Sequence, residues 1–235
     1  NAFQLWKNAI SFNLPTSIKK IGGYAFSECT SMDNLPIPES VEIIGANAFE
    51  KCSRLVTVNM STTVKEIGEK AFFECKDLGT VTFANNSTIN KIADNAFLDC
   101  SSLFKITIPG SVSEMGEGVF KNCTSLERVT IPKNVWIMGN NPFAGCPKLS
   151  LKNESEHFVL EDGVLYDEDK TMIIYFPVND KRTEFAIPEG VNCIGKHCFF
   201  ACDNLEKITI PSSVIRLENN PFSGCTKLNI KNHSP

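Results

Sequence analysis

The sequence predicts a repeat solenoid, a fold in which short coils of chain stack on one another. Nine phenylalanines recur at spacings of 23, 23, 23, 25, 23, 23, 56 and 23 residues, and a cysteine stands three residues after eight of them. A period of about 20–29 residues is typical of coils that bury their apolar side chains only by stacking. The phenylalanines are Phe3, Phe26, Phe49, Phe72, Phe97, Phe120, Phe143, Phe199 and Phe222, and the cysteines are Cys29, Cys52, Cys75, Cys100, Cys123, Cys146, Cys202 and Cys225.

The first segment of each coil is predicted to be a short strand. In the regular coil at residues 126–146, Val129 and Ile131 flank Thr130, which is the alternation of a half-buried strand. A proline such as Pro132 follows in several coils and ends the strand, because it has no amide hydrogen to donate. We expect these strands to form parallel ladders spaced by about 4.8 Å per coil.

The second segment is predicted to be another short extended stretch. It carries two apolar residues spaced by three, such as Val135 and Met138, and a glycine such as Gly139 often follows. Glu218 replaces this glycine in one coil, and glutamate is costly at positive φ. We therefore interpret the glycine as relieving crowding between coils.

The third segment contains the repeated phenylalanine and cysteine. In residues 69–75, Ala71 and Cys75 are four residues apart. This spacing places both side chains on one face of a single helical or 3₁₀ turn, which is the structure we expect here.

The period fails between Phe143 and Phe199. Residues 157–176 alternate in the manner of short strands, and Asp162-Gly163 is a hairpin turn signal. We therefore expect one continuous array over residues 1–235, interrupted by a β-hairpin insertion at about 153–183. Because the chain opens inside a repeat, we expect it to be a fragment of a longer protein.

The repeated pattern Leu-x-x-Val-Thr-Ile-Pro-x-x-Val-x-x-Ile-Gly-x-x-Ala-Phe-x-x-Cys resembles the BspA-like, treponemal type of leucine-rich repeat. The resemblance covers the chain except about residues 153–183. It implies a right-handed leucine-rich-repeat coil with short parallel strands, short helical or 3₁₀ turns, about nine to ten coils and one hairpin insertion. It also implies a cell-surface or secreted protein that adheres to a host matrix protein or another cell-surface protein.

Composition and motifs argue against several other functions. The net charge of −4 argues against nucleic-acid binding. No apolar run approaches the roughly 18–20 residues that cross a bilayer. The chain has three histidines, no His-Glu-x-x-His helix motif and no phosphate-binding glycine loop. We expect no catalytic residues, no cofactor and no metal; calcium at the acidic residues 167–169 is the weaker alternative, because they lack the spacing of an EF-hand loop.

The cysteines are predicted to be a column of reduced, buried thiols. Neighbouring coils would hold their β-carbons about 4.8 Å apart, just beyond the spacing that a disulfide requires. Buried cysteine is also a good small apolar residue. Disulfide pairing and a metal site that includes Cys193, Cys198 and Cys202 stay open as less favoured alternatives.

The outward residues of the first segment form the candidate ligand-contact face. It is a polar row of threonines, with basic residues gathered toward its C-terminal half. A solvated sheet surface rich in strand-forming residues is the alternative interpretation. The candidate residues are Thr57, Thr80, Thr82, Lys105, Thr107, Arg128, Thr130, Lys207 and Thr209.

The second segment has mostly charged or polar outward residues, with apolar exceptions near the insertion: Trp136, Ile137, Cys193 and Ile215. An exposed apolar cluster would be a contact site. Alternatively, the hairpin folds back over these residues. We expect Trp136 and Ile137 to pack against the hairpin.

The sequence thus favours a non-enzymatic protein-interaction or adhesion module that binds through its repeat face. A glycan-binding module is one alternative, since threonine, asparagine and basic residues hydrogen-bond sugars, but the outward strand columns offer no aromatic platform. A structural spacer that displays other domains is the other alternative.

Overall fold

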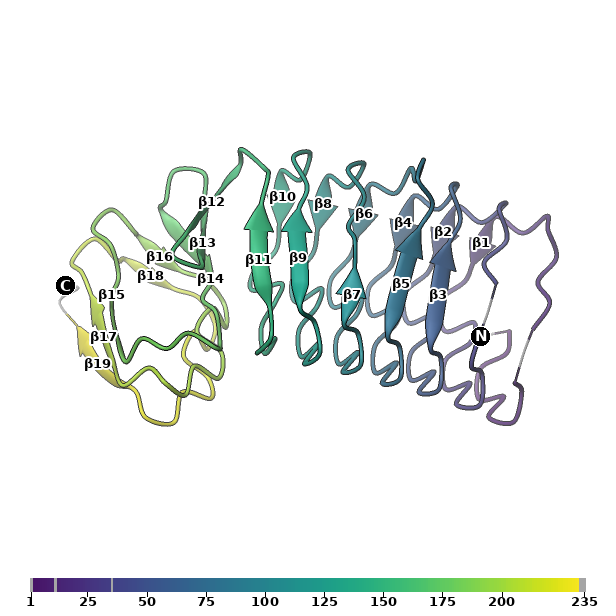
Figure 1. The fold of residues 1–235 in the computed structure, drawn as a ribbon, viewed down its shortest axis with the longest axis horizontal. Coiled ribbons are helices and arrows are strands. Elements are labelled where there is room, and N and C mark those ends of the chain that lie inside the picture. The colour runs from purple at the N-terminus through teal and green to yellow at the C-terminus, as the bar shows by residue number, and fades with distance from the viewer. Residues whose placement is uncertain (1, 11, 35, 233–235) are drawn as a thin grey trace.

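The protein is a parallel β-solenoid (Figure 1), seen in a computed structural model that describes residues 2–10, 12–34 and 36–232. Each regular coil contributes a strand to a front sheet and a strand to a rear sheet. The front sheet consists of β3 (Thr57–Met60), β5 (Thr80–Phe83), β7 (Lys105–Ile106), β9 (Arg128–Ile131) and β11 (Ser150–Asn153). The rear sheet consists of β1 (Lys20–Ile21), β2 (Ile43–Ile44), β4 (Glu66–Ile67), β6 (Lys91–Ile92), β8 (Glu114–Met115) and β10 (Ile137–Met138).

The strands of neighbouring coils pair in parallel and at equivalent repeat positions. Thr57 pairs with Thr80, Thr80 with Lys105, and Lys105 with Arg128. The predicted short parallel strands are therefore confirmed. None of the described residues belongs to a helix of the length and apolarity that crossing a bilayer requires.

A column of stacked phenylalanine rings fills the core of the first half. From Phe26 to Phe143 the rings of successive coils lie 5.0–5.9 Å apart and within 9° of parallel. Beside each ring, the cysteine thiol donates a hydrogen bond to the phenylalanine carbonyl of the preceding coil, as from Cys75 Sγ to Phe49 O at 3.1 Å. All ten cysteines are free thiols.

The third segment forms β-turns in place of the expected helical or 3₁₀ turn, which the described residues do not contain. Two residues per coil have left-handed backbone conformations, such as Asn47 (φ 56°) and Lys51 (φ 58°) on either side of Phe49. These conformations interrupt a helix and turn alternate amides outward. The Phe49 amide donates to Ala71 O of the next coil at 2.7 Å, and the Cys52 amide closes a turn onto Phe49 O at 3.1 Å.

The glycine that follows the second segment relieves crowding, as predicted. A β-carbon added to Gly139 would lie 2.2 Å from the Glu117 backbone nitrogen, and one added to Gly68 would lie 2.7 Å from the Ala46 nitrogen. Neither glycine has a positive φ. The close approach of neighbouring coils therefore explains this position.

The insertion begins with an antiparallel hairpin of β12 (Phe158–Glu161) and β13 (Val164–Asp167), joined by Asp162 and Gly163 at φ 48° and 82°. The next strand, β14 (Met172–Tyr175), pairs antiparallel with β13 and parallel with β16 (Cys193–Ile194). It takes the place of a rear strand. A sheet of β12, β13, β14, β16 and β18 (Arg216–Leu217) results, which we call the hairpin sheet.

Phe176 resumes the phenylalanine column 23 residues before Phe199. Its amide donates to Cys198 O at 2.9 Å, and its ring lies 4.8 Å from the Phe199 ring. Part of the region expected as an insertion is thus an irregular coil. Nine rear-type strands, six in the rear sheet and β14, β16 and β18, give about nine coils in the described chain.

The front sheet ends at β11 and does not pair with the front strands of the second half. These are β15 (Glu184–Ala186), β17 (Lys207–Ile210) and β19 (Asn229–Asn232), which form a separate sheet that we call the terminal sheet. The hairpin lies between two cores. Leu165 packs into the core of the first half, whereas its neighbours Val164 and Tyr166 pack into that of the second.

Candidate functional site

The front sheet brings most of the candidate contact residues together. Thr57, Thr80, Lys105 and Arg128 pair in register across β3, β5, β7 and β9. Of the remaining front-face candidates, Thr82 and Thr130 are exposed on β5 and β9, and Thr107 is exposed directly after the end of β7.

Lys207 and Thr209 lie apart from these residues. Both are on β17 of the terminal sheet, which does not pair with the front sheet. The Lys207 ammonium also binds Glu184 Oε2 at 2.7 Å. The single face expected across the whole chain is therefore divided, because the hairpin interrupts the front ladder between β11 and β15.

Two adjoining grooves of about 640 and 630 Å³ run along the front face on either side of β7. They share Lys105, Thr107 and Gly110 as lining residues. β7 has two residues whereas β5 and β9 have four, so Thr107 and Ile108 pair with neither neighbouring strand. Departure of the chain from the ladder at this point opens the two grooves.

A longer turn in the preceding coil forms a wall of the β5–β7 groove. The spacing from Phe72 to Phe97 is 25 residues, and the two additional residues lie between β5 and β6. Here the Ser87 amide closes a turn onto Ala84 O at 2.9 Å, and both residues line the groove. The grooves were not predicted from the sequence. The 25-residue spacing between Phe72 and Phe97 is the signal that could have indicated them.

The β7–β9 groove carries cations that have no ionic partner. Lys105, Arg128 and Lys133 line it and are exposed. In the described part of the chain, no carboxylate oxygen lies within 4.0 Å of their side-chain nitrogens. Two carboxylates also line this groove, Glu127 and Glu154, and the second is bound to Lys152 at 2.6 Å. The groove therefore has an excess of positive charge.

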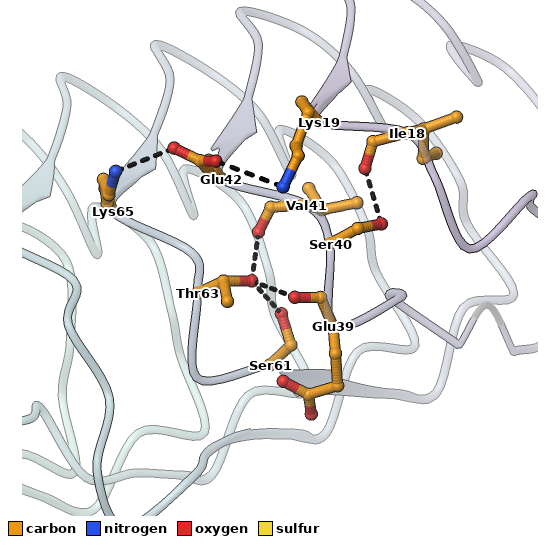
Figure 2. Close-up of polar contacts among 9 residues, drawn as sticks. All are labelled: Ile18, Lys19, Glu39, Ser40, Val41, Glu42, Ser61, Thr63 and Lys65. Atoms are coloured by element: carbon orange, nitrogen blue, oxygen red, sulfur yellow. Dashed lines mark hydrogen bonds and ion pairs between the residues drawn. The ribbon is translucent and has the colours of Figure 1, made fainter.

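The rear face shows the opposite arrangement. Glu42 lies between two lysines, 3.6 Å from Lys19 and 2.7 Å from Lys65 (Figure 2). Farther along, Lys91 lies 3.3 Å from Glu114. Because these charges neutralise each other from coil to coil, the rear face is a solvated ion-pair surface with little attraction for a charged ligand.

Hydroxyl groups between the front and rear strands serve the fold. Ser40 Oγ donates to Ile18 O at 2.7 Å, and Thr63 Oγ1 lies 2.6 Å from Glu39 O and 2.8 Å from Val41 O (Figure 2). These contacts satisfy turn carbonyls that the strand ladders leave unpaired. In contrast, the hydroxyls of Thr107 and Thr130 at the grooves make no hydrogen bond within the described structure.

The predicted apolar patch does not form as expected. Trp136, Ile137 and Ile215 are 56%, 41% and 80% exposed, but Cys193 is buried at 3% beneath Arg216, whose Nε lies 3.2 Å from its sulfur. Trp136 and Ile215 also belong to coils on opposite sides of the hairpin.

The hairpin does not cover Trp136 and Ile137, so that prediction was wrong. Its apolar side chains turn inward instead: Phe158 and Leu165 are buried in the core of the first half. They close the edge of that core where the front ladder stops.

The described residues offer no group of three histidine, cysteine or acidic side chains placed to hold a metal ion. The acidic residues of the hairpin serve local structure: Asp167 Oδ1 accepts from the Met172 amide at 2.8 Å, and Glu168 lies 3.2 Å from His157. His197 Nδ1 lies 3.0 Å from Ser223 Oγ, in a turn between coils. None of these groups opens onto the grooves.

Comparison with known proteins gives a family match. Six copies of the BspA type leucine rich repeat region match residues 1–89, 42–168 and 174–233. No curated protein sequence matches the chain.

Solved structures with the same architecture include bacterial leucine-rich repeat proteins. One from Eubacterium ventriosum is 24% identical with a TM-score of 0.74, over 87% of this chain and 61% of that one. A leucine rich cell surface protein from Faecalibacterium prausnitzii is 28% identical with a TM-score of 0.70, over 97% and 70%. The pneumococcal vaccine antigen PcpA is 22% identical with a TM-score of 0.65, over 99% and 63%. The chain thus spans about 61% of the length of the Eubacterium protein.

Proposed function

The chain belongs to the BspA-type leucine-rich repeat family, and on this premise we propose that it is a non-enzymatic protein-binding module of a cell-surface or secreted protein. Its partner is an extracellular protein, either a host matrix protein or a protein on another cell. Binding takes place at the front face of the solenoid.

The two grooves beside β7 are the observation that carries this proposal. They combine exposed threonine hydroxyls, unpaired cations and main-chain groups released from the ladder. A concave surface with a few convergent polar groups is the usual form of a binding site. On the rear face, in contrast, Glu42 is paired with Lys19 and Lys65, and Lys91 with Glu114.

The surface location is supported by similarity. The Faecalibacterium protein is described as a cell surface protein and is 28% identical over 97% of this chain. A rigid repeat array also suits display, because each coil contacts only its neighbours and the array leaves long faces exposed.

A binding panel of purified extracellular-matrix proteins, run beside a glycan array, tests the proposal. We expect saturable binding to at least one protein. Thr107→Trp places a bulky ring between the two grooves and should abolish this binding. Ser113→Trp is the matched control, because the next coil already carries Trp136 at the same outward position of the rear face.

Three results would contradict the proposal. Binding to glycans alone would favour the glycan-binding alternative. No binding to either panel would favour a structural spacer. Equal loss of protein binding in Thr107→Trp and Ser113→Trp would place the contact outside the front face.

A further inference from the structure

We propose that the β7–β9 groove binds an extended acidic peptide segment of the partner protein, with Lys105, Arg128 and Lys133 as the groups that recognise its carboxylates. This inference rests on the protein-binding function proposed above. It adds the chemistry of the partner and the residues that select it.

The fold retains an unfavourable pairing of like charges beside the groove. Lys105 and Arg128 are direct register partners on adjacent strands. Like charges directly opposite each other destabilise a sheet. Elsewhere the chain avoids this arrangement: in the rear sheet Lys91 pairs in register with Glu66 on one side and Glu114 on the other. An anionic ligand would remove the repulsion at Lys105 and Arg128.

The positive charge of the groove contrasts with the charge of the whole chain. The whole protein has 27 acidic and 23 basic side chains, so a cationic groove is a local property. At the equivalent strand position in the second half, Lys207 is neutralised by Glu184 at 2.7 Å. Repeat geometry therefore does not require a free cation at this strand position.

The lining of the groove also suits an extended peptide. Beside the cations and the carboxylates Glu127 and Glu154, the groove is lined by Phe104, which is 49% exposed. Its floor is formed by buried residues, Ile106, Ile108 and Pro132. Thr107 and Ile108 add main-chain groups that no ladder uses. An extended peptide presents alternate side chains to opposite sides and main-chain groups between them. A segment with carboxylates for the cations and an apolar side chain for Phe104 matches this lining.

A sulfated or carboxylated glycan shares the charge but fits the lining less well. Oligosaccharide sites place sugar rings on exposed aromatic side chains, and Phe104 is the single exposed aromatic residue among those that line the groove. The glycan is therefore an outcome of the test and not part of the proposal.

The test measures fluorescence anisotropy of a labelled peptide of alternating aspartate and valine with the intact chain. We expect saturable binding that weakens as ionic strength rises, since salt screens exposed charges. The double variant Lys105→Gln and Arg128→Gln should weaken binding by about tenfold or more. Lys207→Gln is the matched control, with the same substitution at the same repeat position, and should leave the affinity unchanged.

Loss of folding is a poor explanation for the expected result, because removing two like charges from adjacent strands relieves repulsion. Thermal melts should show the double variant to be at least as stable as the parent. A peptide with asparagine in place of aspartate and a heparin-derived oligosaccharide are the two control probes, and neither should compete with the acidic peptide.

The inference is overturned if the asparagine peptide binds equally well, if Lys207→Gln weakens binding as much as the double variant, or if the oligosaccharide binds and the peptide does not. Its failure is distinguishable from that of the proposed function. A matrix protein that binds the parent but not Thr107→Trp, together with no binding of the acidic peptide, would leave the protein-binding function standing and reject only the acidic partner.

Discussion

The phenylalanine and cysteine of each coil stabilise the solenoid in different ways. The ring supplies apolar area, and its stacking on the rings above and below continues without a gap from Phe26 to Phe143. The thiol is small enough to lie beside the ring and donates to the phenylalanine carbonyl of the preceding coil, which also accepts the turn hydrogen bond of its own coil. Each coil therefore depends on its neighbour for both apolar burial and hydrogen bonding.

Truncation of one ring should be costly at the centre of the column. Phe97 is fully buried, with its ring 5.2 Å from that of Phe72 and 5.5 Å from that of Phe120. We expect Phe97→Ala to lower the free energy of unfolding by about 3–5 kcal/mol. Thr107→Ala, at the exposed groove, should lower it by less than about 1 kcal/mol. Equal denaturant midpoints for the two variants would contradict the assignment of the core.

The cysteines should differ in reactivity although all are free. Burial raises the pKa of Cys75, Cys100 and Cys123 well above its ordinary value. Interaction with the neighbouring Cys202 thiol lowers the pKa of Cys225 to about 7, and the Cys225 side chain is only half-buried. The thiolate is the reactive species, so Cys225 should be alkylated first in the native protein, at a rate that rises as pH passes about 7.

Mass spectrometry of peptides after a brief pulse of iodoacetamide checks this order. Unfolding the protein in denaturant without a reductant is the control, and it should expose all ten thiols to the label. Faster labelling of the central column than of Cys225 would show that the first half opens more readily than the C-terminal coils.

His197 should make the protein sensitive to mild acid. Burial of the ring, reinforced by the charges of Lys121 and Lys196, lowers its pKa. The unfolded chain then binds a proton more readily than the folded one, so stability falls as pH drops through and below about 6.5. Asparagine does not titrate, and it occupies the equivalent left-handed position at Asn47 and Asn220.

We therefore expect His197→Asn to lose less stability than the parent between about pH 7.5 and 5.5. Urea melts of both proteins at the two pH values provide the measurement. Carboxylates that titrate in the same range affect both proteins equally and cancel in the comparison. An identical loss in the two proteins would show that His197 is not the sensitive group.

At the scale of the elements, the hairpin joins the two halves of the chain. Leu165 is fully buried in the first core, and its neighbours Val164 and Tyr166 are buried in the second. Tyr175 occupies a position where regular coils have alanine, and its ring meets that of Phe143 edge-on at 5.7 Å. The parallel stack of rings stops at this contact. At the junction between the two halves, the hairpin therefore covers part of the exposed end of the first core.

Leu165→Ala should weaken this junction. We expect a loss of about 2–5 kcal/mol for a buried leucine and separate unfolding of the two halves. Both tryptophans, Trp6 and Trp136, lie in the first half, so their fluorescence reports that half, whereas circular dichroism reports both. The midpoints from the two probes should coincide in the parent and separate in the variant, and coincident midpoints in Leu165→Ala would argue against a coupling role.

The elements that repeat were predictable from the sequence, and the irregular ones were not. Alternation around Thr130 predicts the front strands, and the apolar pair Val135 and Met138 predicts the rear ones. The turn geometry was not predictable, because Asn, Lys, Glu, Tyr and His all occupy the left-handed positions and composition gives no warning of them. Phe176 was missed because no cysteine stands three residues after it.

The candidate site shows the same limit. Its side chains were predictable, because the outward position of a strand follows from alternation. The grooves were not predictable, since they arise where the chain leaves the ladder after Ile106 of β7. Where strand pairing ends depends on the neighbouring coils and not on the local sequence. Separation of Lys207 from Lys105 was also hidden, because the sequence does not tell where a ladder stops.

At the scale of the whole molecule, the protein consists of two stacked arrays with separate cores. The first is the more regular and carries the groove; the second is shorter and includes the terminal sheet. The first and last described coils lie at opposite ends of the molecule (Figure 1). A partner bound at the front face therefore meets the flank of a long body and not its tip.

The coil-to-coil hydrogen bonds give this body particular mechanical properties. They run along the solenoid axis, as from the Phe49 amide to Ala71 O, so tension applied at the two ends loads the interfaces in series and opens the weakest one first. Each coil that peels away would release 23 residues, about 80 Å of extended chain. Single-molecule pulling should show repeated small steps of this length in place of one rupture. A module of this kind lengthens under load. The force on a partner bound at its front face therefore rises gradually.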